Sequence, residues 1–266
     1  MSTLLKAFSL MYHDVVPAGE FATSGISGAD ADIYKLDRVA FIQHLDAVAQ
    51  VGKVRSCLEN WQTGPPPVFL TFDDGGGCSP WIADELSKRG WCGHFFITTD
   101  WIGKPGFVTA ADLRAMRAGG HVIGSHSASH PLRILALPIE QIDREWNSSV
   151  KVLSDILGEP VTTGSVPGGF YSRQVGESAV RAGVKMLFIS EPTEVCEPGA
   201  GGCLLLGRFF VQQGMPAAAA ASFAGGPGMA RTKQALAWKV KKTLKALGGD
   251  LYIKARVAYF SKTARP

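Results

Sequence analysis

Val68-Phe69-Leu70-Thr71-Phe72-Asp73-Asp74-Gly75 is the stretch of this 266-residue chain that decides its fold. An apolar run rich in β-forming residues stops at two adjacent carboxylates, which are followed by more glycine. Such a run is typical of a parallel strand that is covered on both faces. Because the two carboxylates repel each other, we expect one of them to bind a cation while the other stays free as a base. The alternative is a solvated Asp-Asp-Gly turn with no chemical role.

A second polar cluster, His126-Ser127-Ala128-Ser129-His130-Pro131, argues against the solvated turn because it also follows an apolar segment. In parallel α/β folds, ligands bind at the C-terminal ends of the strands, where these residues and His13 are expected to meet. Two imidazoles four residues apart and one carboxylate make the open three-ligand site of a catalytic divalent ion. We expect zinc, with cobalt or nickel as alternatives.

The chain alternates between strand-like and helix-like segments, which indicates βα units and a parallel sheet. About seven such units predict an α/β fold that closes into an irregular barrel. No glycine pattern of a nucleotide-binding loop lies at a strand-to-helix turn, so no nucleotide cofactor is expected. The expected strands are 8–12, 68–72, 94–98, 121–124, 161–166, 185–190 and 204–211; the expected helices are 39–51, 81–89, 110–118, 138–157 and 174–182; residues 15–35 are expected to form a loop.

Composition is that of a folded domain, because 46% of the residues are apolar and 19% are charged. The five cysteines include no C-x-x-C pair, and although Cys196 and Cys203 could bridge, we expect reduced thiols. The first ten residues lack a long apolar stretch and a cleavage site, so neither a signal peptide nor a membrane span is expected. We therefore expect a cytoplasmic protein.

Two of these motifs resemble those of a known family. Thr71-Phe72-Asp73-Asp74-Gly75 and His126-Ser127-x-x-His130-Pro131 resemble the first two motifs of the polysaccharide deacetylases, the NodB-homology or carbohydrate esterase family 4 group. Ser165-Val166-Pro167-Gly168-Gly169 lies where the third motif of that family, Arg-x-Pro-x-Gly, is expected. The resemblance covers residues 8 to 211. It implies a distorted (β/α)7 barrel and the metal-dependent hydrolysis of an N-acetyl group on a sugar.

The resemblance also implies a role for individual residues. Asp74, His126 and His130 would hold the metal, and Asp73 would be the general base. The backbone N–H of Gly168 would donate to the oxyanion, where losing one such donor typically costs about 2.7–4 kcal/mol. The expected substrate contacts are Pro167, Gly169 and Tyr171.

The sequence departs from the family pattern in two places. Ser165 stands where an arginine usually steadies the base, and we consider Arg173 as its substitute. The C-terminal Leu-x-His motif, which supplies the general acid, is missing because residues 204–211 contain no histidine.

The opening Met11-Tyr12-His13-Asp14-Val15 offers a replacement for the missing histidine. It resembles the Tyr-His-Asp-Val opening of deacetylases of poly-N-acetylglucosamine, in which the barrel is circularly permuted. The resemblance implies that His13 protonates the leaving amine, with Glu191, Glu194 or Asp14 holding its ring. The alternative is a histidine that only caps the first strand.

Charge divides the chain into a barrel, residues 1–228, and a basic amphipathic segment, residues 229–266. The segment holds ten of the 27 basic and one of the 23 acidic residues, so its net charge is +9 and that of the barrel is −5. Within it, apolar residues recur at helical spacing (Leu236, Val240, Leu244 and Leu247). Residues 231–247 are therefore expected to contact an anionic membrane at its inner face. Docking of the apolar stripe on the barrel is an equal alternative, and nucleic acid is not expected because no recognition motif is present.

The favoured function is the removal of an N-acetyl group from a sugar in a polysaccharide or in a lipid-linked glycan precursor. Two alternatives stay open. One is a catalytically silent barrel that binds glycan, which the departures at Ser165 and in the C-terminal motif make plausible. The other is a related C–N hydrolase, such as a sugar deformylase.

Overall fold

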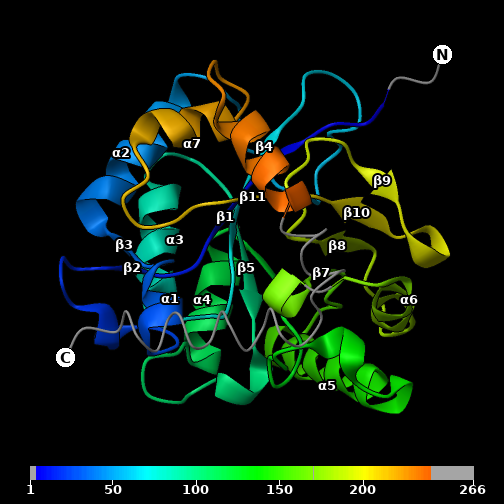
Figure 1. The fold of residues 1–266 in the computed structure, drawn as a ribbon. Coiled ribbons are helices and arrows are strands. Elements are labelled where there is room, and N and C mark those ends of the chain that lie inside the picture. Colours follow the sequence, from blue (N-terminus) through cyan, green and yellow to red (C-terminus); the bar gives the residue numbers. More distant parts are fainter. Residues whose placement is uncertain (1–3, 170, 241–266) are drawn as a thin grey trace.

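A curled sheet forms the centre of the computed structural model, which describes residues 4–169 and 171–240 (Figure 1). Its strand order is β11-β1-β4-β5-β6-β7-β8-β10-β9, and all neighbouring pairs are parallel except β10 and β9. Parallel pairing brings the C-terminal ends of the strands to one edge of the sheet. The strands are β1 (Phe8–Tyr12), β4 (Val68–Phe72), β5 (Gly93–Ile97), β6 (Val122–Ser125), β7 (Thr163–Ser165), β8 (Met186–Phe188), β9 (Glu197–Pro198), β10 (Leu204–Leu206) and β11 (Phe209–Phe210).

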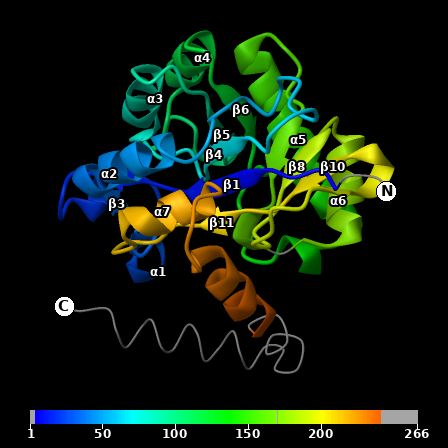
Figure 2. The same ribbon diagram turned by 90° about the horizontal axis from the view of Figure 1, so that it is seen from above.

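Helices surround this sheet on its outer face, as the view from above shows (Figure 2). Most of them connect successive parallel strands, which is the arrangement of βα units. No helix among residues 4–169 and 171–240 is both long enough and apolar enough to cross a membrane. The helices of four or more residues are α1 (Ala29–Asp32), α2 (Arg38–Ala49), α3 (Ser79–Ser87), α4 (Ala110–Ala118), α5 (Ile139–Leu157), α6 (Arg173–Arg181) and α7 (Ala217–Phe223), and residues 230–240 are also helical.

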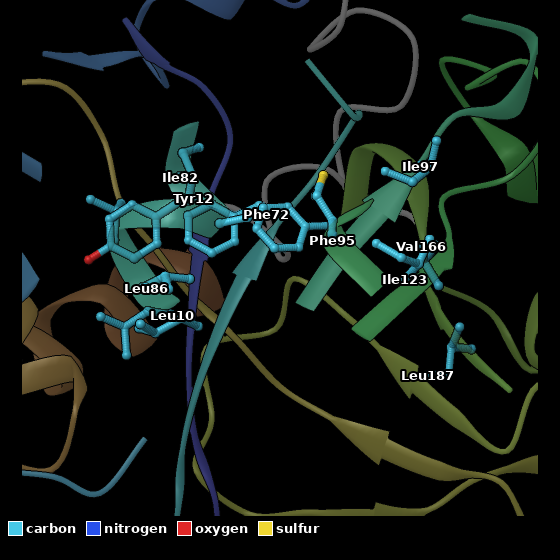
Figure 3. Packing of buried hydrophobic residues seen from close by; sticks show 14 of the residues in the cluster. Leu10, Tyr12, Phe72, Ile82, Leu86, Phe95, Ile97, Ile123, Val166 and Leu187 are labelled. Atoms are coloured by element: carbon cyan, nitrogen blue, oxygen red, sulfur yellow. The ribbon is translucent and has the colours of Figure 1, made fainter. Parts of the chain in front are cut away.

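Strand β4 shows how side-chain alternation divides the core. Phe72 stacks between Tyr12 of β1 and Phe95 of β5, at ring-centroid distances of 5.5 and 4.9 Å, and this row packs in the large helix-facing cluster (Figure 3). Phe69 belongs to the other cluster, on the opposite face of the strand. Because successive side chains point to opposite faces, Thr71 and then Asp73 follow Phe69 toward the inside of the curled sheet.

The sheet closes through one bent segment instead of a single last strand. The sequence predicts one strand over residues 204–211, but β10 pairs with β8 whereas β11 pairs with β1 at the other end of the strand order. Gly207 and Arg208 therefore cross from one edge to the other. At residue 207 a Cβ atom would lie 2.4 Å from the side chain of Thr193, so the crossing requires glycine.

The other predicted strands and helices are present, with bounds that shift by a few residues. The predicted loop 15–35 is partly wrong, because it contains β2 (Val15–Val16), a 3-10 turn (Phe21–Thr23) and α1, and β2 pairs with β3 (Leu36–Asp37). These elements are too short to give a periodic apolar pattern. As predicted, all five cysteines are free.

Candidate metal centre and catalytic site

Asp73 and Asp74 follow β4 at the edge of the sheet where the strands end. Both are buried, with side chains almost closed to solvent. Asp74 has a φ of 75°, which breaks the strand alternation that would otherwise send its side chain to the opposite face from Asp73. A non-glycine residue held at positive φ costs about 1–3 kcal/mol, so the surrounding structure must enforce this turn.

His126 and His130 lie in the loop after β6. The Nε2 atoms of both rings are 3.5 Å from Oδ1 of Asp74, and the ring centroids are 5.0 Å apart. The ring of His126 is fixed because its Nδ1–H donates to the carbonyl oxygen of Ser165 at 2.9 Å. That bond leaves Nε2 with a free lone pair toward Asp74, as a metal ligand requires.

These three residues fit a divalent cation. Their ligand atoms all lie within 4.8 Å of one another, and Oδ1 of Asp74 is buried without a hydrogen-bond partner among the described residues. Burial raises the pKa of Asp74 to about 7, so a negative charge there is costly without a compensating cation. Burial lowers the pKa of His126 to about 3 and also lowers that of His130, which keeps both rings neutral. Neutral imidazoles are the form that binds metal.

Asp73 has a different partner, Arg208, which the sequence analysis did not identify. The two guanidinium nitrogens Nη1 and Nη2 donate to Oδ1 and Oδ2 of Asp73 at 2.7 and 2.8 Å. Nη2 also donates to Ser165 Oγ at 2.7 Å, and Nη1 donates to Thr71 Oγ1 at 3.3 Å. Burial alone would raise the pKa of Asp73, but the Arg208 guanidinium overrides burial and holds that pKa well below its ordinary value. Asp73 is therefore ionised at neutral pH.

The predicted substitute, Arg173, is wrong. Its side chain is exposed at the start of α6 and pairs with Glu177 four residues later. Arg208 was detectable in principle, because Leu204-Leu205-Leu206-Gly207-Arg208-Phe209-Phe210 contains one charge in an apolar run. A charged side chain in such a run is buried only when it is paired, so the pattern predicts an acidic partner for Arg208.

His13 follows β1 at the same edge of the sheet. Its ring lies 4.7 Å from that of Tyr34. Its Nδ1 is buried without a hydrogen-bond partner among the described residues. The role of His13 as the general acid stays a prediction.

Two of the three carboxylates expected to hold the ring of His13 have other partners. Asp14 accepts hydrogen bonds from Ser24 Oγ and Cys78 Sγ. Glu194 pairs with Lys6 and Arg231. Glu191 is the remaining candidate, and its carbonyl oxygen accepts the N–H of Arg208.

The third motif forms a tight turn, Pro167–Gly169, directly after β7. Gly168 and Gly169 have φ values of 63° and 69°, which glycine adopts without strain. A Cβ atom at residue 169 would lie 2.9 Å from the side chain of Ser190 and 3.5 Å from that of Trp238. Tyr171 packs against α6, where a Cβ on Gly176 would meet its ring at 3.0 Å. The structure places these residues near the end of β7, and their contacts with a substrate stay a prediction.

Helical residues 230–240 pack beside β11. The amide of Gln234 is buried and pairs with the backbone of Phe210, accepting its N–H at 3.0 Å and donating to its C=O at 2.9 Å. Leu236 and Val240, by contrast, are 64% and 53% exposed. Docking of the apolar stripe on the barrel is therefore wrong for these two residues, while Leu244 and Leu247 lie outside the described residues.

Part of the chain is similar to known carbohydrate deacetylases. Residues 61–187 match the family model described as "Polysaccharide deacetylase". The peptidoglycan-N-acetylmuramic acid deacetylase PdaA of Bacillus subtilis is 30% identical over 127 residues, which make up 46% of each chain. The chain thus spans about half the length of this curated relative.

Two solved structures share the fold over most of the chain. The deacetylase PplD of Streptococcus pyogenes, in complex with acetate, superposes with a TM-score of 0.68 at 19% identity, over 81% of this chain and 96% of its own. IcaB from Ammonifex degensii superposes with a TM-score of 0.67 at 22% identity, over 82% of this chain and 97% of its own. The predicted deacetylase-type barrel is confirmed.

Proposed function

We propose that the chain is a metal-dependent hydrolase of N-acetylated sugars, because residues 61–187 match the family model of the polysaccharide deacetylases. It would remove the N-acetyl group from a sugar in a polysaccharide or in a lipid-linked glycan precursor. The names of its relatives support this substrate class, since they include deacetylases of peptidoglycan N-acetylmuramic acid and of chitooligosaccharides.

One observation carries the proposal: two adjacent carboxylates have opposite surroundings. Asp73 is held by the guanidinium of Arg208, whereas Oδ1 of Asp74 faces the Nε2 atoms of His126 and His130. Two neighbouring acids whose environments separate their pKa values are typical of a site with divided roles. Asp74 is thus suited to bind a metal, and Asp73 is suited to act as a base.

In this proposal Asp74, His126 and His130 hold a divalent ion, zinc by preference and cobalt or nickel as alternatives. When bound, such an ion polarises the acetamide carbonyl and lowers the pKa of water from about 15.7 to about 7. Asp73, ionised and fixed by two hydrogen bonds from Arg208, accepts the proton of the attacking water.

The remaining roles concern the tetrahedral intermediate and its collapse. The N–H of Gly168 donates to the oxyanion, and His13 gives a proton to the departing amine nitrogen. Pro167, Gly169 and Tyr171 are the proposed substrate contacts. The turn Pro167–Gly169 supports these roles, because its two positive-φ glycines let the backbone approach a ligand closely.

The experiment that tests this function is metal analysis together with acetate release from a panel of N-acetylated saccharides, including chitooligosaccharides. We expect about one divalent ion per chain, as a single three-ligand site implies. Acetate release should stop when a chelator removes the metal and should return when metal is added back. Bound metal without any acetate release would favour the silent glycan-binding barrel. Formate release from N-formylated sugars without acetate release would favour the deformylase.

We also propose that residues 231–247 contact an anionic membrane, with the protein at the cytoplasmic face and its glycan substrate lipid-linked. The support is the net charge of +9 in residues 229–266 and the exposure of Leu236 and Val240. Lys233 and Lys239 are exposed on the same helical segment. Apolar residues flanked by lysines on the side away from the barrel suit the surface of a bilayer better than nucleic acid.

A further inference from the structure

The metal-ligand loop after β6 is held in a backbone conformation that it does not favour. Among residues 4–169 and 171–240, the non-glycine residues with positive φ are Asp74, Ser127 (64°) and His130 (56°). Asp74 and His130 are proposed metal ligands, and Ser127 lies in the loop between the two histidines. Such conformations persist only where neighbouring groups enforce them. The question is which side chain enforces them in residues 126–130.

Glu145 of α5 is the side chain that binds this loop most extensively. Its Oε2 accepts the backbone N–H groups of Ala128 and Ser129 at 2.9 and 2.8 Å, and its Oε1 accepts the hydroxyl of Ser129 at 2.6 Å. Hydrogen bonds to a carboxylate are roughly twice as strong as bonds between neutral groups. One carboxylate thus takes up two successive backbone donors that lie between the two histidines.

Other hydrogen bonds also hold the loop. One helical turn beyond Glu145, Ser149 Oγ lies 2.8 Å from Ser125 Oγ, which in turn accepts the N–H of Ser127 at 3.2 Å. The N–H of Asp100 also donates to the carbonyl oxygen of Ala128 at 2.9 Å. Glu145 is the charged member of this set, and helix α5 anchors it.

We propose that Glu145 is a positioning residue that forms the metal-ligand loop before the metal binds. This inference rests on the proposed metal site. Held by Glu145, the loop presents Nε2 of His130 at 3.5 Å from Oδ1 of Asp74. Without that carboxylate, residues 127 to 130 relax toward negative φ and the imidazole of His130 leaves the ligand set. The metal affinity then falls, because binding must reorder the loop.

The test is the affinity of the metal-free, full-length protein for Zn²⁺, measured in competition with a chromophoric chelator. Glu145→Ala is expected to weaken Zn²⁺ binding about 10–100-fold, as is typical when a side chain that orients metal ligands is lost. Glu145→Gln keeps one acceptor oxygen, so its Zn²⁺ affinity should lie between those of wild type and Glu145→Ala. The matched control is Glu140→Ala, since Glu140 is exposed in the first turn of the same helix, and it should bind Zn²⁺ within about twofold of wild type.

Two further readouts separate positioning from a general effect on stability. The absorption spectrum of bound Co²⁺ should change in Glu145→Ala and not in Glu140→Ala, because it reports the geometry of the ligands. A residue that only stabilises the fold would lower the melting temperature and leave the Zn²⁺ affinity of the folded protein unchanged. If Glu145→Ala does not fold, the Zn²⁺ affinities of Glu145→Gln and Glu140→Gln are compared instead. A weaker affinity in Glu145→Gln alone would support the positioning role.

Failure of the proposed metal site can be distinguished from failure of the proposed role of Glu145. Wild-type protein that binds no divalent ion would overturn the metal site, and the role of Glu145 with it. Wild-type protein that binds Zn²⁺ together with a Glu145→Ala variant that binds it equally well would overturn only the role of Glu145.

Discussion

Arg208 and Asp73 form a buried, two-pronged ion pair although 135 residues separate them in the chain. The guanidinium is fully buried, and its position is set by Gly207, where the chain crosses between the two edges of the sheet. Ser165 accepts a third hydrogen bond from Arg208 and itself donates to Asp73 at 3.4 Å. The departure from the family motif at Ser165 thus coincides with an arginine that reaches the same carboxylate from another segment.

Removal of Arg208 should destabilise the fold as well as impair turnover. Arg208→Met leaves Asp73 buried without its partner, and breaking a buried pair costs about 3–5 kcal/mol of unfolding free energy. Urea unfolding of the single variants and of Arg208→Met/Asp73→Asn measures the coupling, and the double variant should recover part of the loss. Arg173→Ala is the control and should change stability by less than about 0.5 kcal/mol. An equal loss in Arg173→Ala would contradict the assignment of Arg208.

Loss of a metal ligand should strip the metal. His126→Ala or His130→Ala leaves two of three ligands, so we expect most of the bound divalent ion and most of the activity to disappear. Elemental analysis after dialysis measures the metal, and acetate release measures turnover. Alanine at His121, which accepts the N–H of Gly93 through Nδ1 and lies away from the ligand set, is the control that should keep the metal. Full metal content in both ligand variants would rule out the proposed ligand set.

Asp73→Asn should separate metal binding from catalysis. The substitution keeps the shape of the side chain and removes the charge, so the metal should stay bound while kcat falls by about 10²–10⁴-fold, the usual contribution of a general base. Asp74→Asn should instead release the metal. The reverse pattern, with metal lost from Asp73→Asn and kept in Asp74→Asn, would exchange the roles of the two carboxylates.

His13→Ala should reduce turnover in a way that depends on the leaving group. If His13 protonates the departing amine, kcat on an N-acetylated saccharide should fall by about 10²–10⁴-fold. An aryl acetate, whose phenolate leaves without a proton, should be hydrolysed at nearly the wild-type rate. Comparable losses on both substrates would indicate a structural role for His13, such as packing on Tyr34.

Membrane contact should depend on the exposed residues of the C-terminal helix. Leu236→Glu/Val240→Glu should abolish sedimentation with anionic vesicles at low salt, whereas Val39→Glu, at another exposed apolar residue, should leave it unchanged. High salt should release the wild-type protein, because each lysine near an anionic surface contributes about 1 kcal/mol that salt screens. Truncation after Gly228 is a poorer test, since it also removes the contact of Gln234 with β11. Wild-type protein that stays in the supernatant at low salt would refute the contact.

The sequence by itself determined the alternation of strands and helices and the residues of the candidate metal centre. Local patterns suffice for this, because a buried strand such as Val68–Phe72 is apolar along its whole length and α5 repeats its apolar residues every three to four positions. Asp74, His126 and His130 could be grouped because parallel strands end at one edge of the sheet, whatever their exact geometry.

Only the tertiary structure decided which arginine reaches Asp73 and which face of the C-terminal helix is exposed. The strand periodicity of residues 204–211 is the same whether they form one strand or two, so the crossing at Gly207 and the partner of Arg208 depend on the closure of the sheet. The helix likewise buries the polar Gln234 and exposes Leu236, because the backbone of Phe210 makes two hydrogen bonds with the Gln234 amide that an apolar side chain could not make. Both outcomes follow from contacts between distant segments, which no local pattern encodes.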